Sequence, residues 1–232
     1  MIRFDAAEVI APAAGGSVRV LQPITLELTE QRIALIGANG SGKSTLARLV
    51  NGLVLPSTGT VTVRGRDTAH DGAAVRRLVG FAFTNPAAQL VMPTALEDVA
   101  LSLRRTHPRK ARRLDAARAV LARFGLEQLG ERSVHTLSGG QQQLLALAGV
   151  LAGEPEILVA DEPTTLLDLR NSRAMTELLL SLRQQLIVAT HDLSLAARCE
   201  RVIVMEAGAV AFDTAAEGAG PDEAVRWYGA RA

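Results

Sequence analysis

The spacing of hydrophobic residues predicts two kinds of β-strand in this chain. Apolar and polar side chains alternate over residues 17–20 and 24–28, and again over 60–63. Such alternation is typical of half-exposed antiparallel strands. We therefore expect an antiparallel sheet that receives strands from both sides of the intervening segment.

Short uninterrupted apolar runs predict a second, buried sheet. They lie within residues 32–36, 79–83, 157–161 and 186–190. Strands buried on both faces have this pattern in parallel sheets. Two further apolar runs, 202–205 and 210–212, flank a Glu-Ala-Gly-Ala turn, so we expect them to form a closing hairpin.

Helical spacing dominates the stretch from the Asn85-Pro86 loop to about residue 125. The positions that predict one packed helix face are Leu114, Ala117, Val120, Leu121 and Phe124. We infer a helical subdomain inserted between core strands. Trp227 and Tyr228 are expected to pack a short terminal helix, and we assign them no chemistry.

A cluster of basic residues lies inside the helical stretch. Its members are Arg104, Arg105, Arg109, Lys110, Arg112, Arg113 and Arg118. Two interpretations stay open: a solvated helix face, or a surface attracted to anionic lipid headgroups or to an acidic partner. The net charge of +1 and the pI near 8.0 argue against a chain that works mainly on nucleic acid.

A glycine-rich loop with the pattern Gly-x-x-x-x-Gly-Lys-Ser follows the first apolar run. It comprises Gly37, Ala38, Asn39, Gly40, Ser41, Gly42, Lys43, Ser44 and Thr45. Its glycines let backbone N–H groups curl around an anion, and the helix that follows would point its unpaired N–H groups at the same place. We predict a phosphate-binding loop in which Lys43 reaches the β- and γ-phosphates and Ser44 binds Mg²⁺.

A second helix start carries its own predicted anion site. Ser138 and Gln141 have the spacing of a capping box, and Gly139 and Gly140 lie between them. The exposed helix N-terminus attracts an anion. A chain that binds one nucleotide needs two such sites only if they serve different nucleotides or different copies of the chain.

Two acids and a histidine follow buried strands. Asp161 and Glu162 end one apolar run, and His191 follows another. Ligands of open α/β sheets bind at the carboxyl ends of the strands, so these side chains are expected near the phosphates. Asp161 suits the Mg²⁺ shell and Glu162 suits a base for water, while His191 can hydrogen-bond a γ-phosphate or the attacking water.

The distribution of apolar and basic residues indicates a cytosolic location. The longest uninterrupted apolar run, near residues 144–153, is about half the length of a membrane span. The amino terminus carries Asp5 and Glu8 and lacks a basic segment followed by a long apolar one, so a secretory signal is not expected. Cys199 is the single cysteine, which excludes an internal disulfide, and we expect it to be a buried bystander.

Taken in order, these features resemble the ATP-binding cassette (ABC) ATPases over nearly the whole chain. The pentapeptide Leu137 to Gln141, which corresponds to the signature motif of that family, is the most specific of them. The resemblance implies an α/β fold with a RecA-like parallel-sheet core, an antiparallel β subdomain and an inserted helical subdomain. Residues 1–83 and 153–232 would form the first two parts, and residues 84–152 the helical subdomain with the signature motif.

The resemblance also implies a head-to-tail pair of cassettes with two ATP molecules between them, which accounts for two anion sites in one chain. The residues of one copy that hold phosphates and Mg²⁺ would be Lys43, Ser44 and Thr45. Those of the other copy that cap the γ-phosphate would be Ser138, Gly139 and Gly140, with Gln141 in the same motif. Asp161 would stabilise the Mg²⁺ shell, Glu162 would be the general base and His191 the switch histidine. Residues 166–168 would cross the dimer interface.

A narrower resemblance covers residues 79–86, 89–94 and 97–100. These segments are similar to the ATPases of energy-coupling factor transporters, which import vitamins and transition-metal ions, and most similar to the biotin-uptake ATPases. The resemblance implies a transmembrane coupling subunit and a substrate-binding membrane subunit as partners, at the cytoplasmic face of the cell membrane. Import of cobalt or nickel, and a soluble role in iron–sulfur assembly, stay open as alternatives.

Two features depart from the family pattern. Thr84 stands where most ABC ATPases have a glutamine whose amide oxygen reaches the Mg²⁺ shell. Either a water bridges from Thr84, or Gln89 substitutes, or the Mg²⁺ coordination is looser. The adenine base usually stacks on an aromatic residue upstream of the loop, but none lies between Phe4 and Phe81, so an aliphatic contact such as Val18 would serve.

Overall fold

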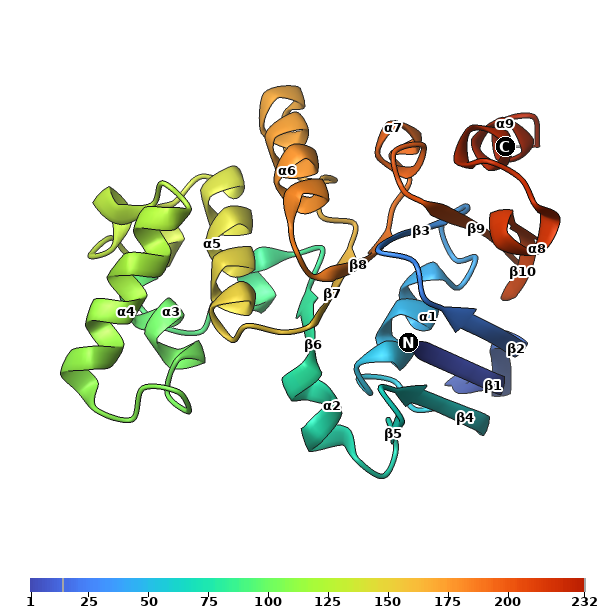
Figure 1. Ribbon diagram of the computed structural model, residues 1–232, viewed down its shortest axis with the longest axis horizontal. Helices are drawn as coiled ribbons and strands as arrows, with labels where there is room; N and C mark the ends of the chain where they lie inside the picture. The colour runs from blue at the N-terminus through green and yellow to red at the C-terminus, as the bar shows by residue number, and fades with distance from the viewer. Residues whose placement is uncertain (14, 232) are drawn as a thin grey trace.

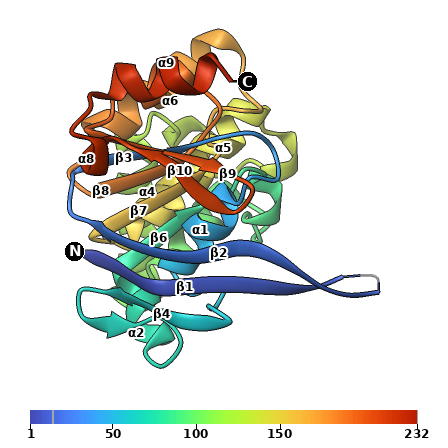
Figure 2. The ribbon, with the colours of Figure 1, turned by 90° about the vertical axis from the view of Figure 1, so that its right-hand side faces the viewer.

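Helix α1 (Lys43–Val50) lies between two β-sheets in the computed structural model, which describes residues 1–13 and 15–231 (Figures 1 and 2). The helix contacts strands of both sheets. Its buried residues Leu46, Ala47, Leu49 and Val50 form one hydrophobic core with the sheet faces on either side. The helix that follows the glycine-rich loop is therefore fixed from two sides.

The antiparallel sheet confirms the predicted alternation. Its strand order is β2 (Gly16–Leu28), β1 (Ile2–Ala13), β4 (Thr58–Val63) and β5 (Arg66–Asp67). Ile24, Leu26 and Leu28 are buried, whereas the residues between them are exposed. The paired outer parts of β1 and β2 project beyond the rest of the molecule as a two-stranded arm (Figure 2). Val18 pairs with Ala11 in this arm and is 49% exposed.

The second sheet contains the predicted buried strands. Its order is β10 (Ala209–Asp213), β9 (Arg201–Glu206), β3 (Arg32–Ile36), β8 (Gln185–Ala189), β7 (Ile157–Asp161) and β6 (Val79–Ala82). Neighbouring strands pair in parallel except β9 and β10, which form the expected hairpin. Every residue of β7 and β8 is buried. The carboxyl ends of β3, β7 and β8 thus meet at one edge of the sheet.

Helices cover the outer face of this sheet. The helices that share its outer core are α5 (Gly139–Ala152), α6 (Leu169–Ser181), α7 (Leu193–Ala196) and α9 (Pro221–Gly229). Trp227 and Tyr228 pack from α9 onto that core, as predicted. Two shorter helices, α2 (Gly72–Leu78) and α8 (Thr214–Glu217), lie against strands at the two ends of the sheet.

A separate helical unit lies at the opposite end of the long axis from the β1–β2 hairpin (Figure 1). Here α3 (Ala95–Ser102) and α4 (Lys110–Arg123) pack with α5 around a core that includes Val99, Ala117, Leu121 and Leu145. Helix α5 also contributes Leu147 and Leu151 to the outer core of the sheet. We propose that residues 84–152 form the helical subdomain, with α5 shared between two cores. No helix in the described residues has both the length and the apolar character needed to cross a bilayer.

Cys199 is buried, as predicted, and its thiol is expected to resist chemical labelling. The residue is 4% exposed, and burial raises the pKa of the thiol to about 12. Because the thiolate is the reactive form, the native protein at pH 8 should react with a thiol-specific disulfide reagent only after unfolding in urea. Absorbance of the released thiol measures the reaction. Complete labelling of the native protein within minutes would contradict the burial.

Candidate active site

The glycine-rich loop connects the end of β3 to the start of α1. Gly37 has a φ of 146°, and a Cβ there would collide with the carbonyl oxygen of Met205. Gly42 has a φ of 103°, and its Cβ would lie 2.6 Å from Cδ2 of Leu21. Gly42 is also the N-cap of α1 and supplies no side-chain cap, so the first N–H groups of the helix lack a side-chain partner. Ser41 Oγ is buried without a hydrogen-bond partner among the described residues, an orphan that a phosphate oxygen would satisfy.

Lys43 lies folded back over the loop. Its Nζ donates to the carbonyl oxygens of Gly37 at 2.6 Å and Ala38 at 3.0 Å. Burial lowers the pKa of this ammonium group, while the charges of Glu162 and Asp161 oppose the shift. A phosphate in the loop would offer this buried cation charged acceptors in place of neutral carbonyl groups.

Asp161 ends β7 and is joined to α1 by two side chains. Ser44 Oγ donates to its Oδ1 at 2.7 Å, and Arg48 Nη2 donates to its Oδ2 at 3.0 Å. The Asp161 side chain is 1% exposed. A hydroxyl and a carboxylate side by side fit Mg²⁺, which takes oxygen ligands from one or two protein groups and the rest from phosphates and water.

Arg48 is a site residue that the sequence interpretation missed. It lies four residues after Ser44, on the same face of α1, and its charge neutralises the buried Asp161 carboxylate. The i, i+4 spacing from the predicted metal ligand was the signal that could have identified it.

Glu162 is held by donors to one of its two carboxylate oxygens. Its Oε2 lies 2.7 Å from Nδ1 of His191 and accepts hydrogen bonds from Thr165 Oγ1 at 3.2 Å and from the backbone N–H of His191 at 3.3 Å. Its Oε1 has no hydrogen-bond partner within residues 1–13 and 15–231. The φ of Glu162 is 52°, and its N–H is fixed to the carbonyl of Ala189 at 2.8 Å. This left-handed backbone is rare outside glycine and is typical of functional positions.

Thr84 meets the site through the backbone rather than through the predicted metal position. Its Oγ1 donates to the carbonyl oxygen of Asp161 at 2.9 Å. The amide of Gln89, the possible substitute for the missing glutamine, accepts from the N–H of Phe83 at 3.2 Å and donates to the carbonyl of Ala146 at 3.3 Å. The segment 83–89 therefore joins the edge of the sheet to helix α5. Direct coordination of Mg²⁺ by Thr84 stays a prediction.

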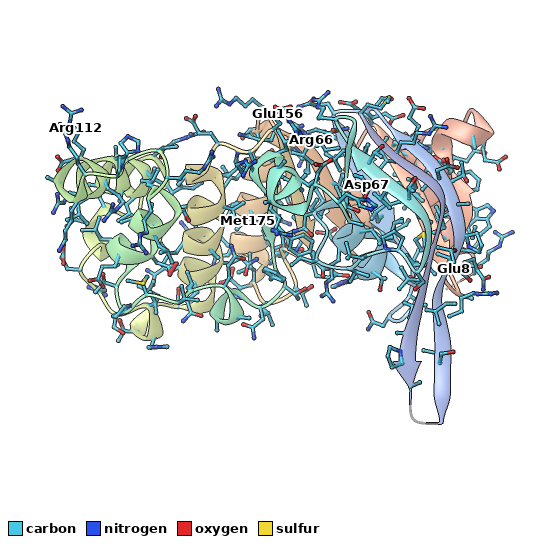
Figure 3. All side chains as sticks on the ribbon, turned by 90° about the horizontal axis from the view of Figure 1, so that it is seen from below. Glu8, Arg66, Asp67, Arg112, Glu156 and Met175 are labelled. Atoms are coloured by element: carbon cyan, nitrogen blue, oxygen red, sulfur yellow. The ribbon has the colours of Figure 1, made fainter. Side chains whose placement is uncertain are left out.

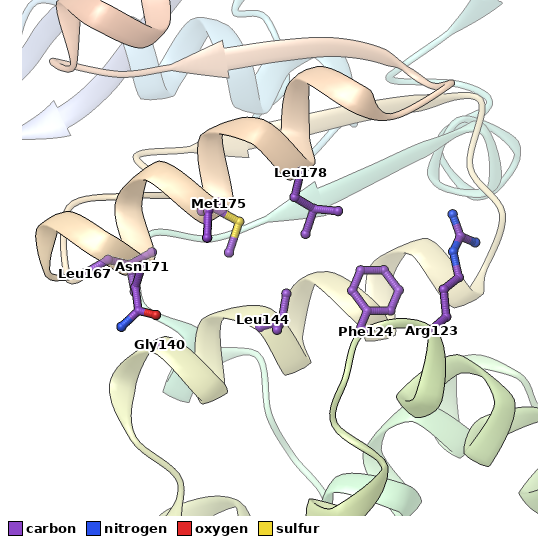
Figure 4. Close-up of a pocket in the computed structure, with 9 residues that line it drawn as sticks. Arg123, Phe124, Gly140, Leu144, Leu167, Asn171, Met175 and Leu178 are labelled. Atoms are coloured by element: carbon purple, nitrogen blue, oxygen red, sulfur yellow. The ribbon is translucent and has the colours of Figure 1, made fainter.

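The second predicted anion site lies at the start of α5. Ser138 and Gln141 form the capping box that their spacing predicts, with both reciprocal hydrogen bonds present. The Cα of Gly140 faces Asn171, since a Cβ on this glycine would lie 3.2 Å from Asn171 Nδ2. Asn171 is itself fixed by Asp168, which accepts its Nδ2–H at 2.9 Å. A cavity of about 250 Å³ between α5 and α6 begins beside this contact (Figure 4).

The predicted site residues thus fall into two groups. The loop group comprises Lys43, Ser44, Asp161, Glu162 and His191, with Thr84 and Arg48 beside it. The signature group comprises Ser138, Gly139, Gly140 and Gln141, with Asp168 and Asn171 beside it. Helices α1 and α5 are separated along the long axis of the molecule (Figure 1).

A cavity of about 590 Å³ lies along the outer side of the glycine-rich loop. It is lined by residues 38–41, by the turn 205–207, and by Tyr228 and Arg231 of the terminal segment. The structure therefore brings Tyr228, to which we assigned no chemistry, close to the exposed apex of the loop at Ala38, Asn39 and Gly40.

Comparison with known proteins identifies this arrangement. The sequence profile of the ABC transporter family matches residues 21–165, which span the loop group from its glycines to Glu162. The chain belongs to the ABC transporter ATPase family. The fold, the ATP-binding loop and the ATPase activity expected from the sequence are those of this family.

Relatives of this cassette include two transport ATPases. It is 46% identical over 212 residues to the biotin transport ATP-binding protein BioM of Rhizobium etli, a match that covers 91% of the cassette and 92% of BioM. It is 38% identical over 186 residues to the energy-coupling factor transporter ATP-binding protein EcfA1 of Halalkalibacterium halodurans, covering 78% and 67% of the two chains.

Solved structures of similar fold include a dimeric ATP-binding cassette in a post-hydrolysis state bound to ADP and Pi. The TM-score is 0.81 at 28% sequence identity, and the match covers 92% of this chain and 97% of that one. CbiO1 of Clostridium perfringens, part of the ABC transporter complex CbiONQ, also has a TM-score of 0.81 at 28% identity, covering 97% of this cassette and 90% of CbiO1.

Proposed function

We propose that this cassette is the ATP-hydrolysing subunit of an energy-coupling factor importer for biotin. The observation that carries the biotin assignment is the similarity to BioM, which extends over about nine tenths of both chains. The energy-coupling factor class is supported by the similarity to EcfA1 and CbiO1. Hydrolysis itself rests on the geometry around Glu162.

The groups that bind ATP are already positioned by the fold. The loop N–H groups, Ser41 Oγ and Lys43 Nζ meet the phosphates, and Lys43 exchanges two backbone carbonyls for phosphate oxygens. Ser44 and Asp161 are the residues that would hold Mg²⁺. The ion would bring positive charge to the β- and γ-phosphates.

Glu162 activates the water. Its Oε2 is occupied by donors from His191 and Thr165, so Oε1 is the atom that accepts the proton. The Nδ1–H group of His191 orients this carboxylate. The backbone N–H of Glu162 donates to the carbonyl of Ala189 in β8, which holds Glu162 at the edge of the sheet. Lys43 and the loop amides stabilise the charge that develops on the transferred phosphoryl group.

The signature group completes the site of a second copy. Helix α5, which begins at the signature group, lies apart from α1, which begins at Lys43, in one chain (Figure 1). We therefore propose a head-to-tail homodimer in which each copy caps the nucleotide of the other. The dimeric cassette of similar fold supports this assembly. Each of the two sites then uses groups of both copies.

The remaining partners are membrane proteins. We propose that the homodimer lies at the cytoplasmic face of the cell membrane, against a transmembrane coupling subunit and a substrate-binding membrane subunit. The segment 83–89 passes between the Asp161 backbone and helix α5, so a change at the nucleotide can displace the helical subdomain. That displacement would couple ATP hydrolysis to a conformational change in the membrane partners.

Purification from native membranes tests this function. A tagged copy is extracted in mild detergent, its co-purifying proteins are identified by mass spectrometry, and bound biotin is assayed. Two multi-span proteins together with biotin are the expected result. Bound cobalt or nickel would replace biotin as the cargo, and recovery only from the soluble fraction with iron–sulfur assembly proteins would overturn the transport function.

Nucleotide selectivity is expected to be relaxed. Between Phe4 and Phe81 there is no aromatic ring to stack on adenine, and Val18 offers only an exposed aliphatic surface. Since the phosphates supply most of the contacts, GTP should compete within about tenfold of ATP, or ~1.4 kcal/mol. Competition against a fluorescent ATP analogue measures the ratio. A preference for ATP of about a hundredfold or more would show that a base-specific contact exists.

A further inference from the structure

The helical subdomain carries a concentrated positive charge that the nucleotide site does not use. Between Asp98 and Asp115 the sequence holds six cations and no acid. These cations, which we call the basic end, are Arg104, Arg105, Arg109, Lys110, Arg112 and Arg113. The whole chain has a net charge of only +1, so the rest of it is acidic on balance.

The side chains of the basic end lie mostly in solvent. Five of its members are exposed, and none of the six forms a salt bridge within the described residues. The sixth, Arg113, is half-buried and donates from Nη1 to the carbonyl oxygens of His107 and Pro108. Arg113 thereby fixes the turn between α3 and α4. Figure 3 shows Arg112 at the outer end of the helical subdomain, directed away from the ribbon.

The position of these cations opposes helix stability. Helix α4 begins at Lys110 with Arg109 as its N-cap, has no side-chain cap and no acid in its first turn. Cations at a helix N-terminus meet the positive end of the helix dipole. Neighbouring α3 has the favourable arrangement, with Thr94 as a capping side chain and two acids in the first turn. Helix stability therefore does not explain the charge of α4, whereas attraction of an external anion does.

Apolar side chains lie beside the basic end. A groove of about 330 Å³ is lined by Met92 and Leu101 together with Arg104, Lys110 and Arg113. Glu97 also lines it, and its carboxylate accepts the hydroxyl of Thr94. Val91, which precedes Met92 in the chain, is 67% exposed.

The loop that carries Val91 and Met92 is held by hydrogen bonds to a side chain of helix α3. Asp98 Oδ1 accepts the N–H groups of both Val91 and Met92, at 2.9 and 3.0 Å. An exposed apolar residue such as Val91, with the half-exposed Met92 and a cluster of arginine and lysine beside it, is typical of a surface that lies at a membrane interface.

We propose that the basic end binds the headgroups of anionic lipids. Its guanidinium and ammonium groups donate to lipid phosphate oxygens, and Val91 and Met92 meet the interfacial region beside them. The inference rests on the proposed place of the cassette at a membrane, but it requires neither biotin nor ATP turnover. The cassette would then contact the bilayer directly, in addition to its contacts with protein partners.

Flotation with lipid vesicles tests the proposal on the purified chain. Vesicles of phosphatidylcholine alone are compared with vesicles in which about a third of the lipid is phosphatidylglycerol, at low and high salt. The chain should float only with the anionic vesicles, and salt should release it. The triple variant Arg109→Gln, Lys110→Gln, Arg112→Gln should lose about 100-fold in partition coefficient.

A matched variant controls for total charge. Arg66→Gln, Arg76→Gln, Arg77→Gln removes three exposed cations outside the helical subdomain and should keep the binding of the wild-type chain. Both triple variants should retain ATPase activity, which shows that they are folded. No binding to anionic vesicles at low salt, equal binding to neutral vesicles, or equal loss in both variants would overturn the lipid site.

A co-purification experiment distinguishes a lipid ligand of the basic end from an acidic protein partner. If the basic-end variant no longer co-purifies with the membrane subunits while the wild-type chain ignores vesicles, the basic end serves an acidic protein surface and the lipid proposal fails. The proposed function is read independently, from the biotin content of the complex.

Discussion

Replacing Glu162 with glutamine is expected to lower the rate of ATP hydrolysis by about 10²- to 10⁴-fold. Glutamine keeps the shape of the side chain, but its amide cannot accept a proton from water at the position of Oε1. Nucleotide affinity should persist, because Lys43 and the loop N–H groups are unchanged. Phosphate release at saturating Mg-ATP gives the rate, and titration with a fluorescent ATP analogue gives the affinity.

The matched control for this variant is Glu217→Gln. Glu217 is an exposed acid on α8, so the same chemical change there should leave both rate and affinity at the wild-type values. Unchanged hydrolysis in the Glu162 variant would remove this residue as the base. A joint loss of rate and affinity would instead indicate that the site had collapsed.

Replacing Arg201 with methionine is expected to lower the free energy of unfolding by about 3–5 kcal/mol. The Arg201 guanidinium meets Asp213 through Nη2 at 2.6 Å and Nε at 2.8 Å, and both side chains are 7% exposed. Burial alone would lower the pKa of Arg201, but the hydrogen bonds and charges of Asp213 and Glu30 raise it. Methionine would leave the Asp213 carboxylate buried without its counter-ion. Urea unfolding followed by circular dichroism measures the change.

The double variant Arg201→Met, Asp213→Asn separates charge from packing. Asparagine keeps an oxygen that can accept the Ala215 N–H at the start of α8 but carries no charge. Part of the lost stability should therefore return. If the double variant is no more stable than the single one, the cost lies in packing around Arg201 rather than in the isolated carboxylate.

The parts of this cassette that could be predicted from sequence are those in which local chemistry fixes the local structure. The glycines of the loop have conformations that other residues rarely adopt, and the Ser138–Gln141 capping box needs no distant partner. The apolar residues 157–160 of β7 predict a strand buried on both faces. Asp161 follows from its place at the end of that run.

Side-chain partners across long sequence separations could not be predicted. Arg48 and Asp161 are 113 residues apart, and Gln89 reaches Ala146 across 57. These pairs depend on strand order and on the direction in which each side chain leaves its element. Alternation likewise indicates strands without showing what covers them, so Val18 belongs to a predicted strand and still lies exposed on the hairpin arm.

The separation of helices α1 and α5 within one chain, together with the proposed homodimer, has a consequence for cells that contain two kinds of chain. If copies pair at random, a cell in which half of the chains carry a defective Ser138 would contain only about one quarter of fully intact pairs. About half of the pairs would keep one competent site and lose the other. If the proposed homodimer forms, a defect in the signature group should therefore act on wild-type chains as well. The extent of that dominance would report whether one working site suffices for the proposed transport.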